Sequence, residues 1–166
     1  MSDETLLTEA KKFERNLLNF FWRQGVSQGE GEDLVQETYL RFWKYRRDYR
    51  PTAKLSTFLF LLARQVRIDA LRRQSRRLGR EQGWGAEQET ALRPESVTAP
   101  VDSREDVRWA LARLSERHRE VVELGVFQDL PYAEVAEILG IPVGTVKSRM
   151  HNARKELKEL FDERSS

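Results

Sequence analysis

Hydrophobic residues recur at helical spacing in a series of segments separated by polar breaks. In residues 5–22 the apolar positions are mostly three or four apart, and Gly25 with the polar run after it ends that segment. A second amphipathic segment covers residues 30–45, with DLVQETYLRFWKY at its centre. The side chains expected on its buried face are Leu34, Tyr39, Phe42 and Trp43.

A third helix is predicted for residues 56–77, and either Ser56 or Thr57 can cap its start. Residues 58–62 are apolar on every side, which predicts that the first half is buried between neighbouring helices. Past Arg64 the same helix becomes rich in arginine. A merely solubilising face does not explain why acidic residues are almost absent there, so the pattern favours a binding surface.

Residues 78–102 contain several glycines and two prolines with little periodicity. This composition predicts a flexible linker between two domains, residues 1–77 and 103–166. In the second domain a helix is expected from Ser103, and Ser115 can cap the helix that follows. The predicted fold is therefore all-α, with two small helical domains.

Residues 130–155, LPYAEVAEILGIPVGTVKSRMHNARK, predict two short helices joined by a tight turn. Ala136 is small enough to let the second helix cross close over the first, and Val146 points back into the shared apolar seam. Gly140 can adopt the positive φ that ends a helix, and Pro142 suits the first turn of the next one. This spacing is that of a helix-turn-helix, whose second helix enters the DNA major groove.

The outward face of that second helix carries hydrogen-bonding and cationic groups suited to base edges and phosphates. They are Thr145, Lys147, Ser148, Arg149, His151, Asn152, Arg154 and Lys155. A basic face alone also fits a solvated helix on an ordinary bundle. Its combination with the Ala–Gly–Val spacing favours DNA reading.

Charge is strongly segregated along the 166 residues, although the net charge is only +2. Residues 46–80 hold eleven Lys/Arg against two Asp/Glu, whereas residues 81–106 hold seven acids against two bases. Such segregation indicates a polyanion partner for the first segment and a solvated connector for the second. The absence of cysteine excludes disulfides and thiolate chemistry. No signal peptide or long apolar run is present, which predicts a cytoplasmic protein with no membrane insertion.

Asp33 and Glu37 lie one helical turn apart, so a metal site or an acid–base pair must be considered. No histidine or third carboxylate is placed nearby to complete such a site, which favours a solvated or partner-facing helix surface. His118 is flanked by charged residues and is expected at the surface. The sequence therefore predicts no metal, no cofactor and no catalytic site.

Three motifs taken in order resemble a bacterial RNA polymerase sigma factor of the sigma-70 family. They are DLVQETYLRFWKY, LSTFLFLLARQVRIDALRRQ and LPYAEVAEILGIPVGTVKSRMHNARKEL. The compact form is similar to the extracytoplasmic-function (ECF) group, and the likeness covers roughly residues 10–77 and 103–160. The resemblance implies a transcription initiation factor that binds core RNA polymerase and directs it to promoters by reading minus-10 and minus-35 elements. It also implies control by an anti-sigma factor.

The resemblance also implies roles for individual positions. The resemblance implies contacts with two parts of the polymerase, the clamp coiled coil of its largest subunit and its flap region. The clamp coiled coil is expected to bind Asp33, Gln36 and Glu37. Minus-10 DNA is expected at the loop Arg50–Leu55 and the long helix, through Arg50, Lys54, Arg64, Gln65, Arg67, Asp69, Arg72 and Arg73. Minus-35 DNA is expected on the outward face of the helix-turn-helix given above, with Arg154 and Lys155 nearer phosphates.

Two reading positions depart from the family pattern. Family members often carry Asn where Gln65 stands and Arg where Asn152 stands. The family's base preferences are therefore not carried over to these positions. An alternative function is a polymerase-independent helix-turn-helix regulator, which should bind operator DNA by itself, but no apolar dimerisation stripe is evident. A nucleic-acid enzyme using Asp33 and Glu37, or His118, lacks a complete site.

Overall fold

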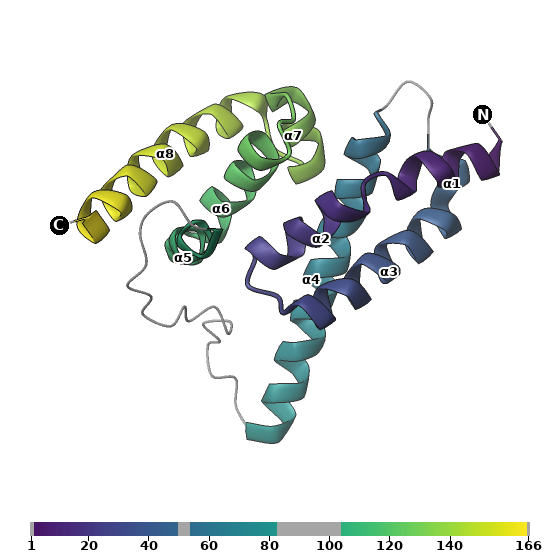
Figure 1. Cartoon of the computed structure of the whole chain (residues 1–166), viewed down its shortest axis with the longest axis horizontal. Helices are drawn as coiled ribbons and strands as arrows, with labels where there is room; N and C mark the ends of the chain where they lie inside the picture. The colour runs from purple at the N-terminus through teal and green to yellow at the C-terminus, as the bar shows by residue number, and fades with distance from the viewer. Residues whose placement is uncertain (1, 50–53, 83–103, 166) are drawn as a thin grey trace. The chain divides into compact units, whose positions relative to one another are not determined.

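The computed structural model describes residues 2–49, 54–82 and 104–165, which form helices and turns throughout (Figure 1). The expected all-α fold is confirmed for this part of the chain. The described helices form two compact units, α1 to α4 and α5 to α8. Each unit has its own apolar core and is described by itself.

The first unit begins with two helices, α1 (Asp3–Lys11) and α2 (Glu14–Arg23), where the spacing predicted one. Ser2 caps α1 by accepting a hydrogen bond from the Thr5 N–H at 3.2 Å. At the break, the Phe13 N–H donates to the Ala10 carbonyl at 3.1 Å, which tightens the chain into a shorter turn. This turn changes the helical register between α1, which buries Leu6 and Ala10, and α2, which buries Leu17, Phe20 and Phe21.

The helix α3 (Gln28–Tyr45) confirms the second predicted helix and ends in a short 3₁₀ turn, η1 (Arg46–Asp48). Phe42 is fully buried, but Trp43, expected beside it, keeps 41% of its surface exposed. Because adjacent helical residues point about 100° apart, burial of Phe42 leaves Trp43 at the edge of the core. There the Arg46 guanidinium covers the indole ring at 4.1 Å from its centroid.

Tyr39 joins α3 to the end of α1 by donating its hydroxyl to the Ala10 carbonyl at 3.0 Å. Burial, followed by the nearby Glu14 carboxylate, raises the pKa of Tyr39 to about 12. The same core contains Leu6, Ala10, Phe42, Leu59 and Leu62. The hydrogen bond and this core hold α1 on α3 and α4.

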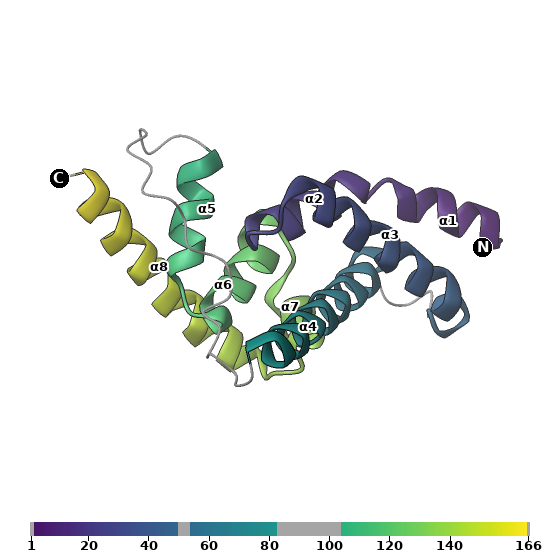
Figure 2. The same ribbon diagram turned by 90° about the horizontal axis from the view of Figure 1, so that it is seen from below.

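The long helix α4 covers Leu55–Gln82, and α3 packs along its first half (Figure 2). It begins before both proposed capping residues, and Thr57 is instead buried within the first turn. The cap prediction was therefore wrong. Residues 78–82, which composition assigned to the linker, continue α4 beyond the ends of α2 and α3 (Figure 1).

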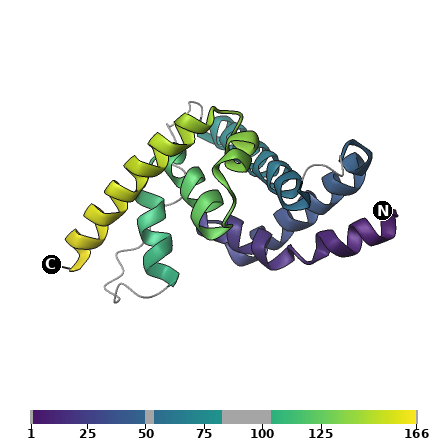
Figure 3. The ribbon, with the colours of Figure 1, turned by 90° about the horizontal axis from the view of Figure 1, so that it is seen from above.

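The second unit contains α5 (Arg104–Arg113), α6 (Glu116–Val122), the π-helical segment η2 (Glu123–Phe127), α7 (Tyr132–Leu139) and α8 (Val143–Ser165). Helix α8, which runs to the C-terminal end in Figure 3, packs on α6, α7 and α5. Ser115 caps α6 as predicted, accepting a hydrogen bond from the His118 N–H at 3.4 Å. These contacts fix α8 along most of its length.

Two polar contacts anchor α8 to its neighbours. Asp106 is fully buried on α5 and pairs with Arg164 near the end of α8. His118, expected at the surface, keeps only 18% of its side chain exposed, and its Nδ1 lies 2.9 Å from the Glu156 carboxylate of α8. The surface prediction for His118 was wrong because α8 folds back over α6. No sequence pattern local to His118 indicates that return.

Candidate nucleic-acid interface

The turn between α7 and α8 has the geometry expected of a helix-turn-helix. Gly140 ends α7 with a φ of 67°, and its N–H donates to the Ala136 carbonyl. A side chain at this φ would be strained, which explains the need for glycine. Pro142 lies one residue before α8 rather than within its first turn, and its carbonyl accepts the N–H groups of Thr145 and Val146 at 3.0 and 3.2 Å.

Helix α8 separates an apolar face from a hydrogen-bonding face. Val146, Met150 and Ala153 lie at spacings of four and three residues and are at most 1% exposed. On the other side, six of the predicted minus-35 side chains are exposed and two, Thr145 and Arg149, are half-buried. The exposed six are Lys147, Ser148, His151, Asn152, Arg154 and Lys155. The structure thus brings the predicted minus-35 residues together on one face.

This face can approach a polyanion without opposing charge of its own. No Asp or Glu occurs between Glu137 and Glu156, so the first three turns of α8 carry cationic and neutral donors only. Ser148 uses its hydroxyl to bond the Thr145 carbonyl at 3.2 Å. The remaining groups offer donors of the kinds that contact guanine, adenine and phosphate oxygens.

On α3, the three predicted polymerase-binding residues do not have equal surroundings. Asp33 and Gln36 are exposed, whereas Glu37 is half-buried and accepts a bond from the Arg41 Nε at 3.2 Å. Leu40, on the same side of the helix, keeps 66% of its surface exposed. No cluster of three metal-ligating side chains occurs among the described residues. The surface combines two free polar groups with an exposed apolar side chain, as a protein partner requires.

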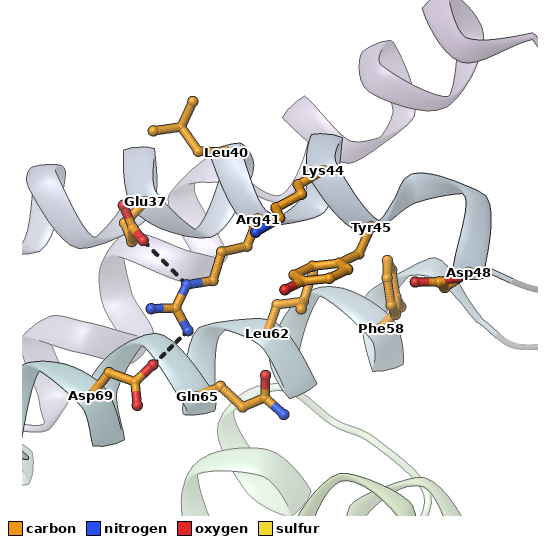
Figure 4. A pocket seen from close by; sticks show the side chains of 10 residues that line it. All are labelled: Glu37, Leu40, Arg41, Lys44, Tyr45, Asp48, Phe58, Leu62, Gln65 and Asp69. Carbon is orange, nitrogen blue, oxygen red and sulfur yellow. Dashed lines mark hydrogen bonds and ion pairs between the residues drawn. The ribbon is translucent and has the colours of Figure 1, made fainter.

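A pocket of about 700 Å³ lies between α3 and α4, and Figure 4 shows the side chains that line it. Its lining consists of Glu37, Leu40, Arg41, Lys44, Tyr45, Asp48, Phe58, Leu62, Gln65 and Asp69. The pocket brings Glu37, assigned by resemblance to the polymerase, close to Gln65 and Asp69, assigned to minus-10 DNA. Sequence reasoning treated these two sets as separate and missed the seven other lining residues as members of a site.

Arg41 lies at the centre of that lining and contacts a carboxylate on each side (Figure 4). Its Nε is 3.2 Å from Glu37 Oε1, and its Nη1 is 2.8 Å from Asp69 Oδ2. Burial alone would lower the pKa of Arg41, but hydrogen bonds with Asp69 and Glu37 raise it overall. The four-residue spacing from Glu37 to Arg41 on one helix indicates the Glu37–Arg41 pair from the sequence.

The predicted minus-10 residues of α4 fall on two faces. Gln65 and Asp69 share one face with Arg72 and Arg73, at spacings of four, seven and eight residues. Arg64 and Arg67 point elsewhere and are both half-buried, unlike the exposed Gln65, Arg72 and Arg73. Lys54 is exposed just before α4. Arg50 lies outside the described residues, as do residues 83–103 with most of the predicted linker.

Two separate helical units, one with a helix-turn-helix and one with a cationic helix beside an acidic one, define a multidomain DNA-binding protein. The chain matches two protein-family models: Sigma-70 region 2 over residues 10–77 and Sigma-70, region 4 over residues 104–157. It therefore belongs to the sigma-70 family, and its relatives place it among the ECF RNA polymerase sigma factors. Sigma factors direct RNA polymerase to promoters. The resemblance inferred from the three sequence motifs is confirmed.

The similar proteins cover most of the chain. ECF RNA polymerase sigma factor SigL of Mycobacterium tuberculosis is 37% identical over 152 residues, covering 86% of this chain and 82% of the relative. RNA polymerase sigma factor YlaC of Bacillus subtilis is 29% identical over 151 residues, covering 90% and 87%. ECF RNA polymerase sigma factor RpoE of Cereibacter sphaeroides is 29% identical over 161 residues, covering 95% and 87%.

Solved structures agree with this assignment. The sigma factor RpoE in complex with the anti-sigma factor NepR from Bartonella quintana has a TM-score of 0.70 at 26% identity, covering 95% of this chain and 92% of that one. CnrH in complex with the cytosolic domain of CnrY has a TM-score of 0.68 at 21% identity, covering 97% of each chain, and shows likeness of fold. Among the described helices, none combines the length and apolar character needed to cross a membrane.

Proposed function

We propose that this sigma factor binds the clamp coiled coil of core RNA polymerase through Asp33, Gln36 and Glu37 on α3. The exposed faces of α4 and α8 then read the minus-10 and minus-35 promoter elements respectively. The observation that carries the proposal is the segregation of chemistry among these three helices. Acidic and apolar groups are exposed on α3, whereas α8 presents an uninterrupted face of cationic and neutral donors.

The proposed division of labour follows the two units. Residues 1–77 form the polymerase-binding and minus-10 domain and residues 103–166 form the minus-35 domain. Residues 78–102 connect them, and the first five of these residues continue α4. Linking two DNA-binding modules raises the effective concentration of the second once the first is bound. Neither module therefore needs tight binding alone. We place the protein in the cytoplasm, without catalytic chemistry of its own, under the control of an anti-sigma factor like the solved relative bound to NepR.

The test of this function begins with co-purification of the protein with bacterial core RNA polymerase. The complex is then used to transcribe a library of random promoters. We expect stable association and transcripts from promoters that share two elements. If core polymerase is not retained, and the protein alone binds an operator duplex tightly, the polymerase-independent regulator is the correct function.

Replacing Arg149 by Ala tests the minus-35 assignment. Loss of a side-chain contact to a base edge costs about 1–3 kcal/mol of discrimination, so preference at one minus-35 position should fall by roughly tenfold. The measurement is transcription from promoters substituted singly across that element. Lys158→Ala is the matched control, because Lys158 is exposed on α8 beyond the predicted reading residues. A promoter profile for Arg149→Ala identical to that of the control contradicts the assignment.

A further inference from the structure

Arg41 connects two carboxylates that the proposed function assigns to different partners. Glu37 lies on the polymerase-facing helix α3, and Asp69 lies on the minus-10 helix α4. Both accept from the one guanidinium, at 3.2 and 2.8 Å (Figure 4). The Arg41 side chain is only 21% exposed, whereas Glu37 and Asp69 keep 38% and 42% of theirs exposed. The cation is therefore fixed in the pocket, and the two carboxylates remain accessible from outside.

Asp69 is an acidic residue on a face of α4 that is otherwise suited to binding DNA. Asp69 shares its face with Arg72 and Arg73, and an unpaired carboxylate there would repel phosphates. Pairing with Arg41 offsets that charge. It also fixes the orientation of the carboxylate, because the Oδ2 atom is held by Arg41. Within the described part of the chain, no hydrogen bond occupies the other oxygen, Oδ1.

We propose that Arg41 is a positioning residue for minus-10 reading. It holds the Asp69 carboxylate so that Oδ1 accepts a hydrogen bond from the exocyclic amino group of an adenine or cytosine at the pocket. This proposal rests on the proposed function, and it deepens it by naming a residue that touches neither partner. In the major groove, adenine and cytosine are the bases that present an exocyclic amino group, and a carboxylate oxygen can accept a hydrogen bond from it.

The hydrogen bond from the Arg41 Nε to Glu37 gives Glu37 a second role. The planar guanidinium can donate to both carboxylates at once from fixed directions, which a lysine ammonium cannot reproduce. Removing the Glu37 charge leaves Arg41 with Asp69 as its only carboxylate partner among the described contacts. The strength of the Arg41–Asp69 pair, and with it the base preference, therefore depends on the state of Glu37. A polymerase group that binds the Glu37 carboxylate competes with Arg41 for it. Such binding therefore changes the base preference through the Arg41–Asp69 pair.

The decisive experiment compares Arg41→Met, Asp69→Asn and the double variant in transcription with core polymerase. The variants are used at saturating concentration, so that differences in core affinity do not contribute. Promoters differ singly across the minus-10 element. We expect each single variant to lower the preference for adenine or cytosine at one shared position by about tenfold. The double variant should be no worse than either single one, because residues that act through one contact are not additive.

Matched controls separate positioning from a purely structural role. Arg15→Met removes an exposed arginine of the same unit and should leave the promoter profile unchanged. A structural defect would lower transcription from all promoters in proportion, whereas positioning changes the ratio between promoters. If Arg41→Met does not fold by circular dichroism, Arg41→Lys takes its place and should give a smaller change at the same position. Glu37→Gln should shift that same ratio in the wild-type background and leave it unchanged in Arg41→Met.

Different results overturn different parts of the proposal. If the wild-type protein does not support transcription with core polymerase, the proposed function fails, and the role of Arg41 fails with it. If wild type transcribes but Arg41→Met has the promoter profile of Arg15→Met, only the positioning role is wrong. Additive losses in the double variant also overturn it, because Arg41 and Asp69 would then act independently. A Glu37→Gln variant that alters core affinity alone excludes the second role of Glu37.

Discussion

Replacing Asp33 and Gln36 together by Ala should lower the affinity for core RNA polymerase by about a hundredfold. Both side chains are exposed on α3, and neither makes a hydrogen bond within the described part of the chain. Central interface residues typically contribute more than about 1 kcal/mol each when truncated, and each 1.4 kcal/mol corresponds to a factor of ten. Two such losses on one surface give the expected magnitude. Folding should be unaffected, because the truncated groups lie outside the core.

The measurement is titration of labelled protein with core polymerase, accompanied by thermal unfolding of the free protein. Glu4→Ala with Gln28→Ala is the matched control, since it also removes one acid and one amide from exposed helical positions of the same unit. Glu4 lies on α1, and Gln28 lies two turns before Gln36 at the start of α3. The control should bind like wild type. Equal affinities for both double variants would show that the clamp does not contact α3 at Asp33 and Gln36.

Local sequence signals predicted much of the second unit. The turn at Gly140 needs a positive φ, the seam needs a small residue at Ala136 and an apolar one at Val146, and the Ser115 cap is a one-turn interaction. Each requirement concerns residues within about a dozen positions, so a single sequence contains it. The helix-turn-helix and the identity of its outward face were accordingly predictable.

Long-range contacts account for what the sequence did not predict. The Arg41–Asp69 pair joins two helices far apart along the chain, and only the packing of α3 on α4 brings them together. Likewise, the pairing of His118 with Glu156 depends on how α8 returns over α6. Periodicity identifies which face of a helix is apolar, but it does not specify the neighbour that covers it. The pocket between α3 and α4 is therefore a property of the fold.

The ends of two helices, α1 and α4, were also difficult to predict. The break after α1 comes from one tightened turn with no glycine or proline to mark it, so the apolar spacing looked nearly continuous. The extension of α4 to Gln82 has the opposite cause. Arginine, leucine and glutamine are good helix formers, and they outweigh one half-buried glycine at Gly79, whose cost is about 1 kcal/mol.

Replacing Val146 by Asp should unfold the second unit while leaving the first unit folded. Val146 is fully buried in the seam between α7 and α8, whose other buried residues, from Val135 to Ala153, are all apolar. An unpaired charge in such a place costs about 3–5 kcal/mol. Domains are stabilised by roughly 0.05–0.15 kcal/mol per residue, so a unit of this size has only a few kcal/mol to lose. The cost of the buried charge is therefore comparable to the whole stability of the unit, and the helix-turn-helix should unfold.

The control is Val143→Asp, on the same helix one turn earlier, where the side chain is 39% exposed. An acid at that position lies in the first turn of α8, where it interacts favourably with the helix dipole. Chemical denaturation followed by circular dichroism should therefore show a wild-type transition for the control and the loss of one unit's signal for Val146→Asp. Lowering the pH should restore part of that signal. Burial raises the pKa of the new carboxyl, so its protonated form, which is favoured at low pH, is the one the seam tolerates.

A Val146→Asp protein that unfolds like the control at neutral pH would mean that α7 and α8 do not share this seam. The placement of the reading face, which depends on that seam, would then be wrong as well.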